Sequence, residues 1–227
     1  MAGSRVKQEQ LGDLKLYRVP ARTSVTSRQI KQVRLLDQHA VPTELLYKAD
    51  VATDLDGSAD FPLHKILRTR NDKAHHLGLP LPSGMVAAFY EHNGVPLLVS
   101  EAPLRDIADK EEFEIELGES PDVRLKVTQE SHLVDPSTVK KLPLVPHVHI
   151  RSIEASHVMR LEVSNARGTP VPAELSLLLP DGSEIVRADH NPTKRNGLPT
   201  FRLTIPANAT ATIRFQVGET EDRAVID

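Results

Sequence analysis

The sequence predicts an all-β protein, and three observations lead to that prediction. Apolar and polar residues alternate over many short segments, which places one side chain in a core and the next in solvent. Clusters of turn residues separate these segments. Seventeen prolines and eleven glycines interrupt the 227-residue chain, and proline disfavours helix interiors because it lacks an N–H group. We therefore expect short strands joined by turns, arranged as two tandem β-sandwich-like units.

The C-terminal half has the clearest alternation. Residues 201–205 alternate between apolar and polar side chains, and after a turn at 206–209 the alternation resumes over 211–217. This pattern predicts an antiparallel hairpin. Other alternating segments in this half are 123–127, 159–163 and 175–179. Short strands at this spacing are typical of a sandwich, although the order of the strands cannot be derived from the pattern.

The N-terminal half is less regular, but the same kind of segment recurs. Strands are expected at 14–19, 32–36, 65–70, 85–90, 95–100 and 113–117, with a possible helical turn at 106–112. A polar, turn-rich stretch at 118–122 precedes the more regular half. We place the domain boundary there, which gives an N-terminal β domain at 10–118 and a C-terminal one at 119–218. A segment containing prolines at 135–146 is the alternative boundary.

The composition excludes several classes of protein. Hydrophobic residues make up 39% and charged residues 26% of the chain, as in an ordinary globular protein. A net charge of −3 gives no extended positive field, so no nucleic-acid partner is expected. The absence of cysteine excludes disulfides and thiolate metal sites. The sequence has no apolar run of about 20 residues, so no transmembrane segment is predicted.

Several short motifs occur along the chain in the same order as in a known family. They are the run at 12–23 followed by 31–33, the turn at 77–84, Gly118 with 122–123, then 163–165 and 205–207. Together, over most of the chain, they resemble the bacterial family called domain of unknown function 4139. The resemblance implies a mostly β protein with an immunoglobulin-like C-terminal part. It implies no catalytic, cofactor-binding or ligand-binding residue.

Members of that family are often exported behind a signal peptide and an additional N-terminal region. Neither feature is found in this sequence. The resemblance therefore leads us to expect the C-terminal portion of a longer exported protein, with a periplasmic or cell-envelope location.

One loop has the composition of a cation site. Asp54, Asp56, Ser58 and Asp60 surround a glycine, and hard cations such as calcium prefer oxygen ligands of this kind. The loop is not an EF-hand, because Lys65 occupies the twelfth position, where that motif needs a glutamate. These four residues are the predicted metal ligands. The alternative is a solvated loop between strands, since Asp, Ser and Gly are common turn residues.

A second metal hypothesis starts from His147 and His149. They are two residues apart, so on a strand both side chains point to one face, as some zinc sites require. The apolar residues between and after them would take the opposite face, which places the histidines toward solvent. A zinc site needs a third ligand, and the sequence offers His132 or His157 without a reason to choose. The alternative is a pair of exposed histidines.

No catalytic residue is predicted. The nucleophilic Gly-x-Ser-x-Gly turn and the phosphate-binding glycine motifs are absent from the sequence. Glu114 and Glu116 could serve acid–base chemistry, but they alternate with apolar residues and are expected on the solvated face of a strand. A sugar-binding surface would need aromatic side chains, and the candidates are Tyr17, Tyr47, Phe89 and Tyr90.

These observations favour a non-enzymatic interaction or scaffold module, with a protein partner bound through loop tips or an exposed edge strand. The alternative is a hydrolase or metal-dependent enzyme whose site lies at the domain junction or in a further N-terminal region. A structural spacer in the cell envelope is a third possibility. The sequence predicts no cofactor and leaves the oligomeric state open.

Overall fold

The computed structural model describes residues 7–11, 14–18, 28, 36–145 and 148–226 and confirms the all-β prediction. Most of the strand expected at 32–36 lies outside these residues. The expected helical turn at 106–112 is a plain turn instead, and a 3₁₀ turn occupies Lys73–His75. The strands are β1 (Lys7–Leu11), β2 (Leu14–Arg18), β3 (Glu44–Ala52), β4 (Ser58–Arg70), β5 (Gly84–His92), β6 (Val95–Leu104), β7 (Glu112–Val145), β8 (Val148–Asn165), β9 (Val171–Leu178), β10 (Glu184–Ala188), β11 (Thr193–Arg195), β12 (Leu198–Ile205) and β13 (Ala209–Ile226).

The chain divides into two compact units made of interleaved segments. The first contains 1–44, 68–86 and 103–115, and the second contains 45–67, 87–102 and 116–227. The boundary predicted at 118/119 lies within β7, whose residues from Glu116 onward belong to the second unit. The tandem division at that point stays a prediction, which limited proteolysis can test.

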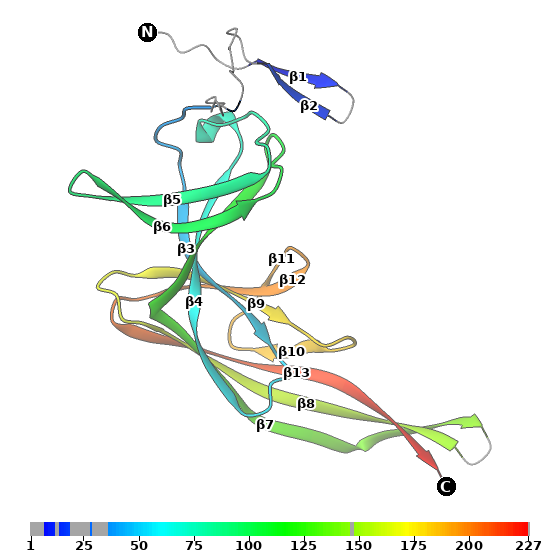
Figure 1. Ribbon diagram of the computed structural model, residues 1–227. Helices are drawn as coiled ribbons and strands as arrows, with labels where there is room; N and C mark the ends of the chain where they lie inside the picture. Colours follow the sequence, from blue (N-terminus) through cyan, green and yellow to red (C-terminus); the bar gives the residue numbers. More distant parts are fainter. Residues whose placement is uncertain (1–6, 12–13, 19–27, 29–35, 146–147, 227) are drawn as a thin grey trace. The chain divides into compact units, whose positions relative to one another are not determined.

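Nine strands form one sheet in the order β10-β13-β8-β7-β4-β3-β9-β12-β11 (Figure 1). β3 and β9 run parallel, whereas β7, β8 and β13 form an antiparallel ribbon. The sheet curls, because Phe201 of β12 packs against Phe215 of β13 with ring centroids 5.5 Å apart although the two strands are far apart in the order. The core of the second unit therefore lies inside this curl.

The hairpin predicted between 201–205 and 211–217 is wrong. β12 pairs with β9 and β11, and β13 pairs with β8 and β10. The alternation was interpreted correctly as one buried face per strand, since Phe201, Ile205, Ile213 and Phe215 are all buried. Alternation does not say which strand lies beside which, and here the two strands face each other across the core instead of pairing edge to edge.

The inward face of the sheet is apolar at alternate positions along each strand, as the period of two requires. Its buried side chains are Tyr47, Ala49, Val51, Leu63, Val123, Leu125, Val127, Met159, Leu161, Val163, Val171, Ala173, Leu175, Leu177, Phe201, Ile205, Ile213, Phe215 and Val217. β7, β8 and β13 continue beyond the residues of this core.

Candidate functional site

Strands β5 and β6 form a two-stranded sheet, and we call its residues Ala87–Ala102 the apolar hairpin. The turn between the strands is Asn93-Gly94, with φ values of 52° and 77°. Two consecutive positive φ values define the type I′ turn, whose twist matches that of antiparallel strands. A two-residue turn also sets the register, which places Tyr90 opposite Leu97 on one face and Phe89 opposite Leu98 on the other.

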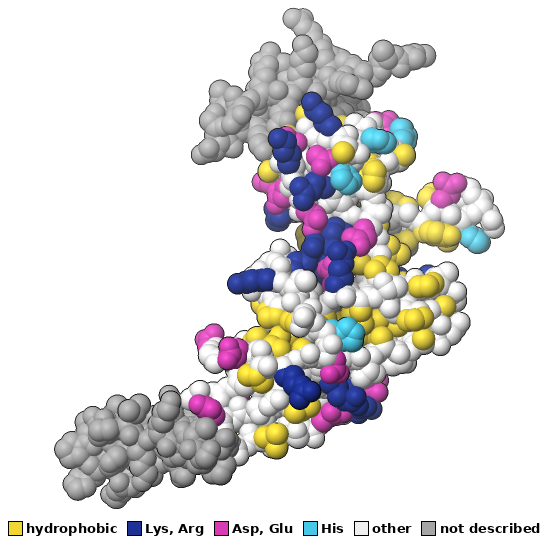
Figure 2. All heavy atoms as spheres, turned by 180° about the vertical axis from the view of Figure 1, so that it is seen from behind, with side chains coloured by type: hydrophobic (Ala, Val, Ile, Leu, Met, Phe, Trp, Pro, Cys, Tyr) yellow, Lys and Arg dark blue, Asp and Glu magenta, His cyan; other side chains and the backbone are white. Residues whose placement is uncertain are grey.

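Both faces of the apolar hairpin expose large hydrophobic side chains, and Figure 2 shows hydrophobic atoms along it. The exposed fractions run from 42% to 63% for Phe89, Tyr90, Val95, Leu97, Leu98 and Val99. The charged residues of the segment are Glu91 and Glu101, and it has no lysine or arginine. An exposed apolar patch on this scale is characteristic of a binding surface.

The sequence of the apolar hairpin differs from that of the alternating strands. Adjacent residues are apolar at Phe89-Tyr90 and again at Leu97, Leu98 and Val99. Continuous apolar runs are typical of strands that are covered on both faces. A two-stranded hairpin is also only marginally stable alone in water. The segment therefore has the sequence of a strand pair that is covered on both faces, although its large apolar side chains are exposed among the described residues.

A second cluster lies on the antiparallel ribbon and consists of His132 of β7, His157 of β8 and Glu219 of β13. We call it the histidine–glutamate cluster. Its ligand atoms, one per residue, all lie within 4.8 Å of one another, and it is the one group of three or more histidine or carboxylate side chains that meets this condition among the described residues. The two imidazole rings stack with centroids 4.4 Å apart and an interplanar angle of 22°. His157 Nε2 is in contact with a carboxylate oxygen of Glu219.

The strand register explains why these three residues meet. His132 pairs directly with His157, and Glu219 pairs with Ala155, two residues before His157. His157 lies two residues from the buried Ala155 and Met159, so its side chain is on the same, core-facing side of β8. Glu219 lies two residues after the buried Val217 and is on the core-facing side of β13. From the sequence, His132 and His157 are expected only as alternative third zinc ligands, and no expectation falls on Glu219.

The other half of the zinc hypothesis is not placed by the structure. His147 lies outside the described residues. The backbone of His149 pairs with Pro143 and Val225, but its side chain is outside the described part of the chain. A zinc site that includes these two histidines stays a prediction.

The predicted calcium ligands lie in the loop before β4 and on β4 itself. Asp54 and Asp56 are exposed in the loop before β4, and Ser58 and Asp60 lie on that strand. Asp60 Oδ1 accepts hydrogen bonds from Arg124 at 2.9 and 2.7 Å. That arginine already balances one of the carboxylates that a cation would need. Calcium binding at this loop stays a prediction that calorimetry can test.

Glu114 and Glu116 take part in ion pairs. Glu114 accepts hydrogen bonds from Arg68 at 2.9 and 2.7 Å, and this arginine is only 4% exposed. Glu116 lies 2.6 Å from Nδ1 of His64. Glu114 therefore balances the charge of a buried arginine rather than lying on an open face, and Glu116 contacts a histidine.

The aromatic candidates separate clearly by exposure. Tyr47 is 1% exposed, and burial raises the pKa of its hydroxyl above the ordinary value of 10.0 despite the nearby Arg167 charge. Phe89 and Tyr90 are more than 60% exposed on the apolar hairpin. The side chain of Tyr17 is outside the described part. Tyr47 belongs to the core, and the two hairpin aromatics remain available to a partner.

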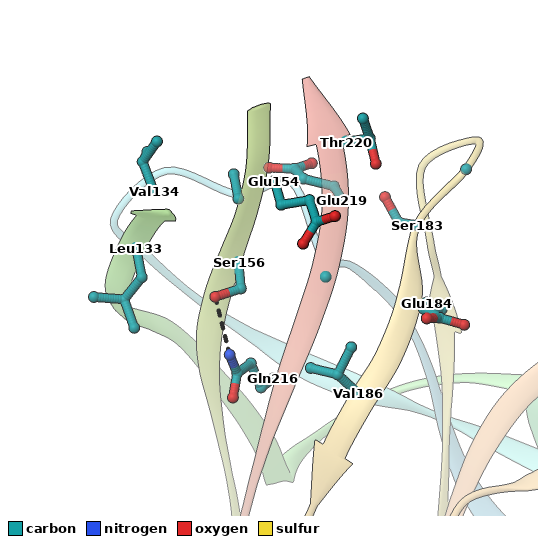
Figure 3. Close-up of a pocket in the computed structure, with 13 residues that line it drawn as sticks. Leu133, Val134, Glu154, Ser156, Ser183, Glu184, Val186, Gln216, Glu219 and Thr220 are labelled. Atoms are coloured by element: carbon teal, nitrogen blue, oxygen red, sulfur yellow. Dashed lines mark hydrogen bonds between the residues drawn. The ribbon is translucent and has the colours of Figure 1, made fainter. Parts of the chain in front are cut away.

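An open groove of about 890 Å³ lies on β8, β13 and β10 (Figure 3). Gln216 donates a hydrogen bond of 2.9 Å to the Ser156 hydroxyl across its floor, and Leu133 and Val186 border it. Its titratable side chains are carboxylates such as Glu154 and Glu184.

Comparison of the chain with protein-family models, with curated proteins and with solved structures found no match. None of the described residues forms a helix long and apolar enough to span a membrane. The assignment of a function therefore rests on the geometry of the apolar hairpin.

Proposed function

We propose that this chain is a non-enzymatic interaction module that binds another protein through the apolar hairpin. The observation that carries the proposal is the exposure of large apolar side chains on both faces of β5 and β6, in a sequence typical of strands covered on both faces. The resemblance to the domain of unknown function 4139 family supports a bacterial, exported protein with an immunoglobulin-like C-terminal part.

The area of the hairpin decides what kind of partner fits it. Its six exposed side chains offer on the order of 600 Å², whereas a stable interface buries roughly 800 Å² on each partner. A second copy lying on one face would cover only about half of that area, well below what a stable interface needs. We therefore propose a partner with an apolar groove that clasps both faces of the hairpin.

Charge supports a protein rather than a lipid surface. Residues 84–104 contain two glutamates and no lysine or arginine. Anionic membranes attract segments through lysine and arginine, so this hairpin lacks that attraction. An uncharged protein groove has no such requirement.

Site-specific photocrosslinking tests the proposal. A crosslinking residue is placed at Tyr90 on one face and at Leu98 on the other, and the chain is incubated with extracts of its native cell. We expect the same partner protein to be crosslinked from both positions. Crosslinking from one face only, to a second copy, or to lipid would contradict the clasp.

Binding of the purified partner then gives the quantitative test. Leu98→Asp places a charge in the proposed interface, and we expect affinity to fall at least ~10-fold, because an interface core excludes unpaired charge. Leu178→Asp is the matched control, since Leu178 of β9 is 43% exposed and lies outside the hairpin. An equal loss for both variants would contradict the hairpin as the binding surface.

A further inference from the structure

We propose that His132, His157 and Glu219 form a binding site for a divalent transition metal ion of the zinc class. The inference does not depend on the proposed function, because the three residues lie on β7, β8 and β13 and not on the apolar hairpin.

Rigid strands hold the three side chains on one face. β7 and β8 pair continuously from Val123 to Gln129, and then the register shifts between Gln129 and Ser131. Before this β-bulge, the odd-numbered residues of β7 face the core, as the buried Val127 shows. The extra residue reverses the phase, so the even-numbered His132 faces the same side as His157. Bulges commonly re-aim a side chain in this way next to functional sites.

The separations fit a metal ion after small side-chain rotations. A tetrahedral zinc ion with bonds of about 2.0–2.1 Å holds its ligand atoms roughly 3.3 Å apart. The ligand atoms of the cluster lie within 4.8 Å of one another, and His157 is already in contact with Glu219. For an ion to be bound, the contacting pair must separate slightly and the wider pair must close.

His157 presents one ring nitrogen to Glu219. This atom is Nε2, whereas Nδ1 is buried and has no hydrogen-bond partner among the described residues. A metal ion shared with Glu219 would therefore be bound through Nε2.

The three ligand side chains indicate which class of ion would bind. Two imidazoles and one carboxylate match zinc, which in catalytic sites is held by such sets with one open position for water. Calcium and magnesium prefer oxygen ligands and are disfavoured by imidazole. With both histidines neutral the set has a charge of −1, so a bound dication leaves a net charge of +1. Apolar neighbours such as Ala155 and Val217 reduce competition from solvent on one side.

Calorimetric titration of the untagged chain with ZnCl₂ tests the proposal. We expect saturation at one zinc ion per chain. His157→Gln and Glu219→Gln each remove a ligand atom and keep most of the bulk, and each is expected to weaken binding by more than ~100-fold, because even the loss of an outer-shell partner costs about 10–100-fold. His132→Gln, at an exposed position, should lose affinity without affecting folding.

His64→Gln is the matched control. His64 contacts Glu116 at 2.6 Å, but this pair has no third ligand in the described part of the chain, so zinc binding should be unchanged. Visible absorption of the Co²⁺-loaded chain gives a second readout, with tetrahedral bands expected in the wild type and lost in His132→Gln. Absence of zinc binding to the wild type, or equal binding by His132→Gln and wild type, would overturn the site. If the His157 and Glu219 variants do not fold, the His132 variant decides.

Discussion

The curled sheet and the apolar hairpin use the same kinds of residue in opposite ways. In the sheet, apolar residues alternate with polar ones, and inward side chains such as Phe201 are 1% exposed. In the hairpin, adjacent residues are apolar on both faces, and Phe89 is 61% exposed. The difference shows that hydrophobicity alone does not decide which side chains stabilise the isolated chain. Coverage of the face decides it, and this leads to paired predictions for the two regions.

The largest effect is expected when one phenylalanine in each region is truncated. Phe201→Ala removes a buried ring that packs on Phe215, and the free energy of unfolding should fall by about 3–5 kcal/mol. Phe89→Ala should change it by no more than about 0.5 kcal/mol, since the side chain is mostly in solvent already. Urea unfolding followed by circular dichroism measures both. Comparable losses for the two variants would mean that the hairpin is covered within the chain itself.

A second comparison concerns an asparagine at a turn in each region. Asn165 is 2% exposed, and its Nδ2 donates to the carbonyl oxygens of Thr169 and Pro206, both at 2.9 Å. Asn165→Ala leaves these buried acceptors without their donor and should cost about 1–3 kcal/mol. Asn93 serves the turn through its backbone φ of 52°. Asn93→Ala should strain the hairpin without moving the global unfolding midpoint in urea.

Hydrogen exchange separates the two asparagine variants further. Asn93→Ala should speed amide exchange within 87–102 and leave the sheet protected, because local opening of the hairpin does not require unfolding of the core. Asn165→Ala should speed exchange in the strands that adjoin its turn. A global loss of protection in the Asn93 variant would show that the two regions unfold together.

Much of the fold could be predicted from the sequence, because burial of one face leaves a period of two. The alternation at 159–163 lies within β8, and that at 175–179 begins in β9, which ends at Leu178. Pairing partners could not be predicted, since alternation carries no information about neighbours. The hairpin assigned to 201–217 fails for that reason.

The candidate sites differ in how far the sequence could have revealed them. His157 and Glu219 come two residues after the apolar Ala155 and Val217, at positions that the alternation assigns to the buried face. A polar residue at such a position can be recognised in the sequence. His132 could not have been found this way, because the bulge between Gln129 and Ser131 inverts its face. The apolar hairpin is visible in the sequence as adjacent hydrophobic residues, but only the structure shows that its side chains are exposed among the described residues.

Among the substitutions in the sheet, the smallest effect is expected for a glycine. A Cβ atom on Gly218 would lie 2.9 Å from Cγ1 of Val186, closer than van der Waals contact allows. Val186 is 52% exposed, so its side chain can rotate toward solvent. Gly218→Ala should therefore cost less than about 1 kcal/mol, at the low end of what overpacking costs in a closed core. Urea unfolding measures this loss.

Removal of the neighbour tests that explanation. Val186→Ala in the Gly218→Ala background should restore the stability of the Val186→Ala single variant, because the close contact is then absent. The corresponding hairpin variant, Gly94→Ala, introduces a side chain at a φ of 77°, and its strain of roughly 1–2 kcal/mol should stay within 87–102. If Gly218→Ala instead costs as much as Phe201→Ala, Val186 is held in place, and the rim of the groove is packed as rigidly as the core.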